Sequence, residues 1–154
     1  MTPKERMLIA MRNGKPDRVP CAPDTSNIIP ARMTGKDWWD VFLHRDPPIW
    51  KAYNNVVKHF GFDGWNLFGD EGFRLIEPGR VETEKKTVRR TETEIDVQTI
   101  YHTPKGDLTE TWRYFSKNTP FCIEGKVKDL AADFAKIEYL YPDIEGYDAS
   151  LLDE

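Results

Sequence analysis

The sequence predicts an α/β chain, and two contrasting stretches predict it. Between residues 19 and 68, short apolar runs flank a longer amphipathic stretch, which is the strand–helix–strand order of a βαβ unit. Such units form parallel sheets with right-handed crossovers. Between residues 79 and 115, apolar and polar residues alternate, which is typical of antiparallel strands. We therefore expect a parallel part beside an antiparallel hairpin or small meander.

The first predicted element is a short helix at the N-terminus. Thr2 is a favoured N-cap, Pro3 suits the first helical position, and Glu5 completes a capping box with Thr2. Gly14 and Pro16 are typical of the end of such a helix. Its apolar residues are predicted to face the core and its charged residues the solvent: Met7, Leu8 and Met11 on one side, and Lys4, Glu5, Arg6 and Arg12 on the other.

Two apolar runs, residues 19–22 and 62–68, are the predicted strands of the parallel part. A brief amphipathic segment at 37–43 precedes a longer helix that begins after Pro48 and ends at Gly61. The apolar side of the longer helix is predicted from its spacing: Ile49, Ala52, Tyr53, Val56, Val57 and Phe60.

The alternating half contains a predicted hairpin whose turn lies at residues 103–107. Pro104 is preset for the bend, and Gly106 is free to adopt a positive φ. The alternating positions on either side of the turn are predicted strand residues: Val81, Thr83, Val88, Ile95, Val97, Thr99 and Tyr101, then Leu108, Glu110, Trp112 and Tyr114. A last helix is predicted over residues 128–139, with Leu130, Phe134 and Ile137 on its buried face.

No flexible linker separates these parts, so residues 1–154 are predicted to form a single domain. Its helix and βαβ part spans residues 1–78, the β-hairpin insertion 79–126, the last helix 127–142, and an acidic tail 143–154.

Composition and charge exclude several classes of function. The net charge of −4 argues against nucleic acid, which needs a basic face. No apolar run is long enough to cross a membrane, and the charged N-terminus does not resemble a signal peptide. Cys21 and Cys122 lie far apart and do not suggest a disulfide framework. We therefore expect a reduced, cytoplasmic setting, with neither nucleic acid nor membrane as a partner.

Three stretches carry a resemblance to a known enzyme family: TPKERMLIAMRNGKPDRVP at 2–20, HFGFDGW at 59–65, and TPKGDLTETWRYF through EGKVKDLAADF at 103–134. In this order they resemble the uroporphyrinogen decarboxylase superfamily, particularly its branch of corrinoid-dependent methyltransferases. The resemblance implies a (β/α)8 barrel, which takes about 250 residues. We therefore expect the N-terminal portion of a TIM-barrel-like fold, with the β-hairpin as an insertion.

The resemblance also implies an activity and its cofactors. In the methyltransferase branch, a histidine and cysteines from the later part of the barrel bind zinc, which activates a thiol. Those positions would lie beyond Glu154, so the chain alone is expected to bind no cofactor and to be inactive, although the family implies zinc and a corrinoid protein. The expected partners are a companion chain that supplies the rest of the barrel, or a second copy of the chain, and a corrinoid protein. The decarboxylases carry an arginine-rich motif where this chain has only Arg32, which argues against decarboxylation.

Polar residues near the ends of the predicted strands are the candidate substrate-binding residues. A barrel places its site at the C-terminal ends of its strands. Asp24 and Asn27 follow the first predicted strand, Asp63 and Asn66 lie in the second, and Asp70 and Glu71 follow it. For Asp24 and Asn27 the alternative is turn formation through side-chain hydrogen bonds to the backbone. For Asp63 the alternative is a hydrogen-bonded carboxylate at the end of a strand.

No metal site is predicted. The chain's two cysteines and three histidines show none of the close spacings that zinc sites use: Cys21, Cys122, His44, His59 and His102. Two alternatives to a methyltransferase segment stay open. One is a small-molecule binding module derived from the barrel, and the other is a non-catalytic subunit that docks through its hairpin.

Overall fold

The structure is a computed structural model that describes residues 1–64, 74–77, 79 and 81–148. The chain forms two compact units, Met1–Glu71 and Gly72–Glu154, which we name the first and the second unit. That residues 1–154 make up one partial domain stays a prediction. None of the helices in the described part of the chain is long and apolar enough to cross a membrane.

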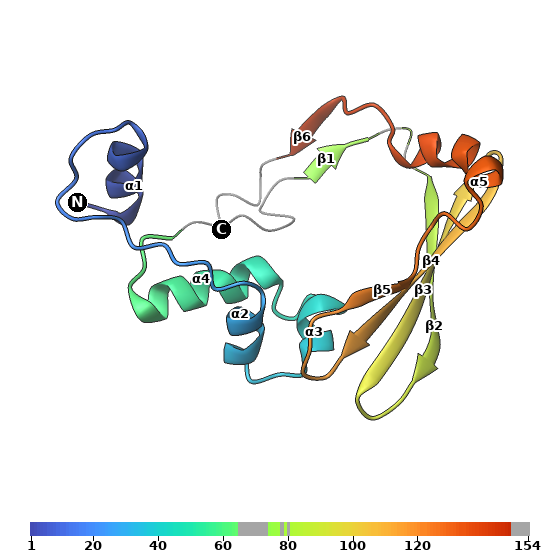
Figure 1. The fold of residues 1–154 in the computed structure, drawn as a ribbon, viewed down its shortest axis with the longest axis horizontal. Helices are drawn as coiled ribbons and strands as arrows, with labels where there is room; N and C mark the ends of the chain where they lie inside the picture. The colour runs from blue at the N-terminus through green and yellow to red at the C-terminus, as the bar shows by residue number, and fades with distance from the viewer. Residues whose placement is uncertain (65–73, 78, 80, 149–154) are drawn as a thin grey trace. The chain divides into compact units, whose positions relative to one another are not determined.

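The first unit is helical in its described part (Figure 1). Its helices are α1 (Pro3–Met11), α2 (Ile28–Met33), α3 (Trp38–Phe42) and α4 (Ile49–Phe60). The predicted capping box is confirmed, because Thr2 and Glu5 each accept a hydrogen bond from the backbone N–H of the other. Two donors that a helix N-terminus leaves without a partner are thereby satisfied.

Helix α4 is confirmed as the long amphipathic helix of this unit. Ala52, Tyr53 and Val56 are buried, whereas Phe60 at its end is 53% exposed. Gly61 ends the helix with φ +66°, in the left-handed region, and its N–H donates to the carbonyl of Val57. A side chain is disfavoured in that conformation, which explains the glycine.

The predicted orientation of α1 is wrong. Arg6, assigned to the solvent side, is 7% exposed, whereas Leu8 and Met11, assigned to the core, are 39% and 62% exposed. The reason is ionic, because the guanidinium of Arg6 pairs with the carboxylates of Asp17 and Asp63. Spacing alone could not reveal these partners, which lie 11 and 57 residues away along the chain.

The predicted barrel segment is also wrong, since both sheets of the described residues are antiparallel. Residues 19–22 form irregular chain in place of a buried strand. Val19 is 83% exposed, and Pro20 and Pro23 lack the N–H groups that a ladder needs. The second predicted strand, 62–68, is irregular at 62–64 and otherwise lies outside the described residues.

The second unit contains a four-stranded sheet in the order β2–β3–β4–β5 (Figure 1). The strands are β2 (Glu82–Arg90), β3 (Glu94–Thr103), β4 (Gly106–Phe115) and β5 (Phe121–Glu124). A separate pair joins β1 (Arg74–Ile76) to β6 (Gly146–Asp148). The predicted hairpin is confirmed, because Thr103 lies opposite Gly106 in the β3–β4 register and Gly106 has φ +107°.

The register divides the side chains of the sheet between two faces. Opposite partners in antiparallel strands share a face. One face, which we name the Glu110 face, carries these residues of β3 and β4: Ile95, Val97, Thr99, Tyr101, Leu108, Glu110, Trp112 and Tyr114. The other, which we name the Asp96 face, carries mainly polar residues: Glu94, Asp96, Gln98, Ile100, His102, Asp107, Thr109, Thr111, Arg113 and Phe115.

Helix α5 (Leu130–Ile137) and the 3₁₀ turn η1 (Glu138–Leu140) confirm the predicted last helix, but its predicted buried face is wrong. Leu130 and Phe134 are 67% and 70% exposed. Asp133 is buried instead, because it accepts hydrogen bonds from the backbone N–H groups of Lys128 and Asp129 and pairs with Lys136. These polar contacts orient the helix and leave its apolar side uncovered.

The left-handed conformation of Gly61 predicts that a residue with a side chain at this position destabilises the chain. Gly61→Ala should lower the free energy of unfolding by about 1–2 kcal/mol, because a Cβ is disfavoured at this φ. The added methyl group would meet no neighbour within 4 Å, so the loss reports the backbone alone. Urea unfolding followed by circular dichroism measures it.

Gly125→Ala is the matched control, since that glycine also has open space around its Cβ position and does not have a left-handed φ. Equal stability losses in the two variants would contradict the assignment of Gly61 as a conformational C-cap.

Candidate functional site

In the first unit, the carboxylate of Asp63 is the centre of a buried ionic cluster. Its side chain has no exposed surface. Arg6 donates to Oδ1, Arg18 Nη1 donates to Oδ2 at 2.7 Å, and the backbone N–H of Cys21 donates to Oδ2 at 2.7 Å. The N–H of Asp63 in turn donates to the carbonyl oxygen of Cys21 at 2.8 Å. One carboxylate thus joins α1, the irregular segment that follows it and the chain just after α4.

Asp17 completes this cluster from the side of Arg6. Arg6 Nε lies 2.6 Å from Asp17 Oδ1, and Arg6 Nη2 lies 2.8 Å from Asp17 Oδ2. This fork holds the pKa of Asp17 at about 2, below its ordinary value of 3.8. The pKa of Asp63 is lowered as well, first by the hydrogen bond from the Cys21 backbone and then by the two guanidinium groups, against the opposing effect of burial.

These contacts favour the structural alternative for Asp63. A carboxylate offers about four lone-pair sites, and Asp63 accepts from Arg6, from both Nη atoms of Arg18 and from Cys21 N. A substrate would therefore have to displace one of these donors. The cluster holds these segments together, and the lowered pKa keeps Asp63 ionised at neutral pH.

The remaining candidate substrate-binding residues are placed as follows. Asp24 Oδ1 accepts from the N–H of Ser26 at 2.7 Å, which forms an Asx turn. Asn27 is the N-cap residue of α2, although its side chain makes no capping hydrogen bond. Within the described residues, the hydrogen bonds of the Asp63 side chain go to Arg6, Arg18 and Cys21, and none goes to Asp24 or Asn27. Asn66 lies outside the described residues, as do Asp70 and Glu71.

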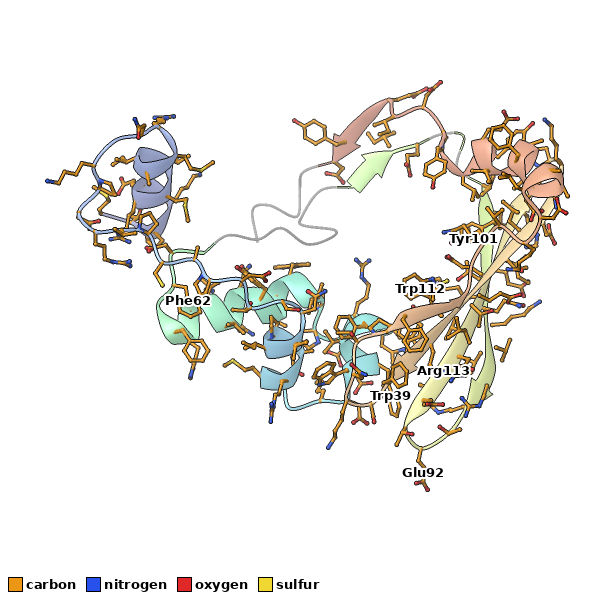
Figure 2. All side chains as sticks on the ribbon, in the orientation of Figure 1. Trp39, Phe62, Glu92, Tyr101, Trp112 and Arg113 are labelled. Atoms are coloured by element: carbon orange, nitrogen blue, oxygen red, sulfur yellow. The ribbon has the colours of Figure 1, made fainter. Side chains whose placement is uncertain are left out.

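In the second unit, Glu110 is the centre of a cluster that sequence reasoning missed. Its side chain is 11% exposed, and Lys126 Nζ lies 3.0 Å from its Oε2. The Tyr101 hydroxyl donates to Oε1, and the indole of Trp112 also donates to this carboxylate. Tyr101 and Trp112 extend from β3 and β4 (Figure 2). The sequence did contain a sign of this cluster. Glu110 stands between Leu108 and Trp112, at a position where the alternating pattern predicts an apolar residue.

The electrostatics of this cluster keep Glu110 ionised. Burial raises its pKa, but hydrogen bonds from Tyr101, Lys126 and Trp112 outweigh that effect, and the pKa lies below its ordinary value. Burial and the nearby charge of Glu110 raise the pKa of Tyr114. Lys126 Nζ also lies 5.1 Å from the centre of the Tyr101 ring, within the range of a cation–π contact.

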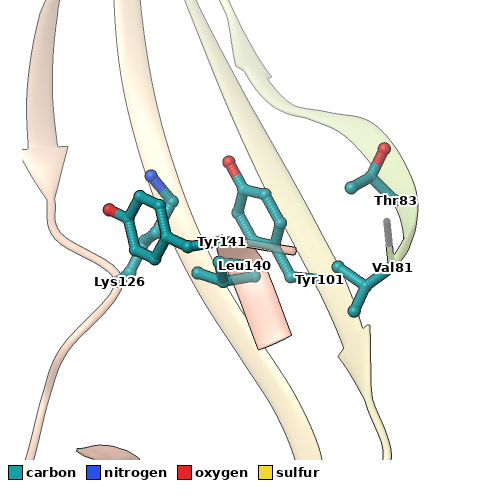
Figure 3. A pocket seen from close by; sticks show the side chains of 6 residues that line it. All are labelled: Val81, Thr83, Tyr101, Lys126, Leu140 and Tyr141. Carbon is teal, nitrogen blue, oxygen red and sulfur yellow. The ribbon is translucent and has the colours of Figure 1, made fainter. Parts of the chain in front are cut away.

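A pocket of about 130 Å³ opens beside this cluster (Figure 3). Its lining combines strand, loop and 3₁₀ residues: Val81, Thr83, Tyr101, Lys126, Leu140 and Tyr141. Tyr101 and Lys126 belong both to the pocket wall and to the contacts of Glu110. The pocket therefore joins an apolar lining to an ammonium group held in place by a buried carboxylate, which suits binding of a small molecule.

On the Asp96 face, Asp96 and Arg113 form a second buried ion pair. Arg113 Nε lies 2.7 Å from Oδ1 of Asp96, and Arg113 Nη2 lies 2.8 Å from Oδ2. Arg113 lowers the pKa of Asp96 through this fork. Arg89 and Glu94 extend the network across the edge of the sheet. Opposite charges balance in this network, which stabilises the β2–β3–β4 pairing.

The described residues contain no group of three or more histidine, cysteine, aspartate or glutamate side chains arranged to hold a metal ion. Cys21 and Cys122 are exposed free thiols. His102 Nδ1 lies 3.0 Å from Asp107 Oδ1 at the exposed end of the hairpin. The residues that the structure describes therefore do not fit the zinc ion that the family resemblance implies.

Comparisons with protein-family models, with curated proteins and with solved structures find no match to this chain.

The Arg6 cluster predicts a dependence of stability on pH. Because the pKa of Asp17 is depressed in the folded chain, its stabilisation is complete above its ordinary pKa of 3.8 and is lost as the pH falls towards about 2. The lowered pKa of Asp63 acts with the same sign. Arg6→Met should lower the unfolding temperature at neutral pH and flatten its decline over this acid range. Thermal unfolding followed by circular dichroism measures both effects.

Lys4→Met removes an exposed charge from the same helix and serves as the control. It should preserve both the unfolding temperature at neutral pH and the steepness of the acid decline. If Arg6→Met behaved like Lys4→Met, the cluster would not stabilise the first unit.

Proposed function

We propose that the chain is a non-catalytic, associating segment of a uroporphyrinogen decarboxylase-like, corrinoid-linked methyltransferase, and that it is inactive alone. The family relationship is supported by the resemblance of residues 2–20, 59–65 and 103–134. The associating role is supported by one observation above all, the uncovered apolar side of α5. Its setting is the cytoplasm, where the exposed thiols of Cys21 and Cys122 stay reduced.

Leu130 and Phe134 make the apolar side of α5, which we name the α5 face. They stand four residues apart and therefore lie on one side of the helix. At 67% and 70% exposure, both keep most of their surface in water. Large apolar side chains placed together in this way are typical of protein contact sites. Burying the two side chains against a partner would stabilise association by about 1.5–3 kcal/mol each as an upper limit.

The buried side of α5 explains why the chain itself does not cover these residues. Asp133 is held by backbone N–H groups at the start of the helix, and Lys136 Nζ lies 3.0 Å from it. Lys136 also donates to the carbonyl of Asp107 in β4 at 3.4 Å. These contacts place a polar side of the helix against the sheet, so Leu130 and Phe134 face away from it.

The partner in this proposal supplies the chemistry. A methyltransferase of this kind needs zinc ligands and access to a corrinoid protein, and the described residues hold no cluster suited to zinc. The partner is a companion chain that carries those groups. When that companion is missing, a second copy of the chain covers the α5 face instead.

Sedimentation of the purified chain over a wide range of concentration tests this role. The chain should self-associate reversibly, because the α5 face lacks its companion. The double variant Leu130→Glu with Phe134→Glu should be monomeric under the same conditions, since buried unpaired charges oppose association.

The matched control is Ala135→Glu, which introduces a charge at another exposed position of α5. It should associate like the parent chain. A parent chain that is monomeric at every concentration, or an Ala135→Glu variant that dissociates as fully as the double variant, would overturn the proposal.

A further inference from the structure

We infer that the pocket beside Glu110 binds a small monocarboxylate with a compact, branched aliphatic body. The site lies within the second unit, and its ligand is independent of the associating role proposed above. Three features carry the inference: the size of the pocket, its division into a polar and an apolar end, and the N–H donors of Lys126 that Glu110 does not use.

The size of the pocket sets the size of the ligand. An engineered protein cavity of about 150 Å³ holds one benzene molecule. The present pocket has about 130 Å³, so it accommodates a body of roughly five or six non-hydrogen atoms. Tyr141, which forms one wall, is 76% exposed, and a ligand can enter past it.

The lining is polar at one end and apolar at the other. In Figure 3 the polar tips of Lys126, Tyr101 and Thr83 lie towards one end, whereas the side chains of Val81 and Leu140 lie towards the other. An amphiphilic molecule matches this division, with its charged head beside Lys126 and its branched chain between Val81 and Leu140.

Lys126 has the capacity to bind an anionic head. An ammonium group has three N–H donors, and the polar contact that Lys126 Nζ makes within the described part of the chain is with Glu110 Oε2. The carboxylate of Glu110 fixes the position of this ammonium at 3.0 Å. The remaining donors suit the two oxygens of a ligand carboxylate, in charge-assisted hydrogen bonds.

The charges around the pocket favour an acid over an amine. The charges of Glu110 and Lys126 balance one another. Lys85 adds a positive charge on the same face of the sheet, because it lies opposite Thr99, which in turn lies opposite Glu110. An ammonium ligand would compete with Lys126 for the carboxylate of Glu110, which already accepts hydrogen bonds from Tyr101, Lys126 and Trp112.

Calorimetric titration of the 154-residue chain with isovalerate tests the inference directly. Isopentanol and isopentylamine have the same branched chain and differ only in the head group. Isovalerate should bind saturably, and at least about tenfold more tightly than either analogue, because a hydrogen bond to a charged group contributes about 1.5–3 kcal/mol.

Substitutions at Lys126 and Val81 locate the site. Lys126→Met should weaken isovalerate binding at least about tenfold, whereas Lys126→Arg should retain it. Val81→Phe leaves the Glu110–Lys126 pair intact and should abolish isovalerate binding by filling the apolar end of the pocket. This variant therefore tests the site even if Lys126→Met fails to fold. Lys117→Met, an exposed lysine between β4 and β5, is the control and should bind like the parent.

Three results would overturn the inference. The first is a folded parent chain with no saturable binding of isovalerate. The second is isopentylamine binding as tightly as the acid. The third is a Val81→Phe variant that folds and binds isovalerate with unchanged affinity.

Discussion

Buried carboxylates constrain the fold of this chain, because each buried carboxylate must receive hydrogen bonds from donors that replace those of water. Counted over the whole residue, Asp63, Asp96, Glu110 and Asp133 are all at most 9% exposed. Burying a charge without partners raises the free energy of the fold far more than one hydrogen bond lowers it. The chain around each of these groups is therefore arranged to supply donors. Arginine supplies them to Asp63 and Asp96, lysine and aromatic side chains to Glu110, and backbone N–H groups to Asp133.

Two of these groups link the fold to the functions proposed for it. Glu110 fixes the ammonium of Lys126 at the polar end of the pocket, so a structural ion pair also prepares a site for an anion. Asp133 fixes the orientation of α5, and the apolar residues of that helix are left facing outwards. The pocket and the α5 face therefore have the same kind of origin, although they would take different ligands.

Local features of the fold could be predicted from the sequence, and long-range features could not. The capping box of α1, the end of α4 at Gly61 and the β3–β4 hairpin depend on neighbouring residues, and all three are present. The burial of Arg6 depends on a partner 57 residues away, which periodicity cannot reveal. The parallel sheet was inferred from the order of apolar runs and from a family resemblance, but prolines around residues 19–22 deny that segment a strand ladder. Glu110 was visible as a charge among alternating apolar positions, but its partner Lys126 follows a later strand.

Amide hydrogen exchange along α5, measured at low and at high protein concentration, tests the associating role most directly. If a second copy covers the α5 face when the companion is missing, amides of Leu130–Ile137 should exchange more slowly as the concentration rises. Amides of β2, an exposed edge strand of the sheet, should exchange at the same rate at both concentrations. Exchange in α5 that is independent of concentration would contradict the proposal.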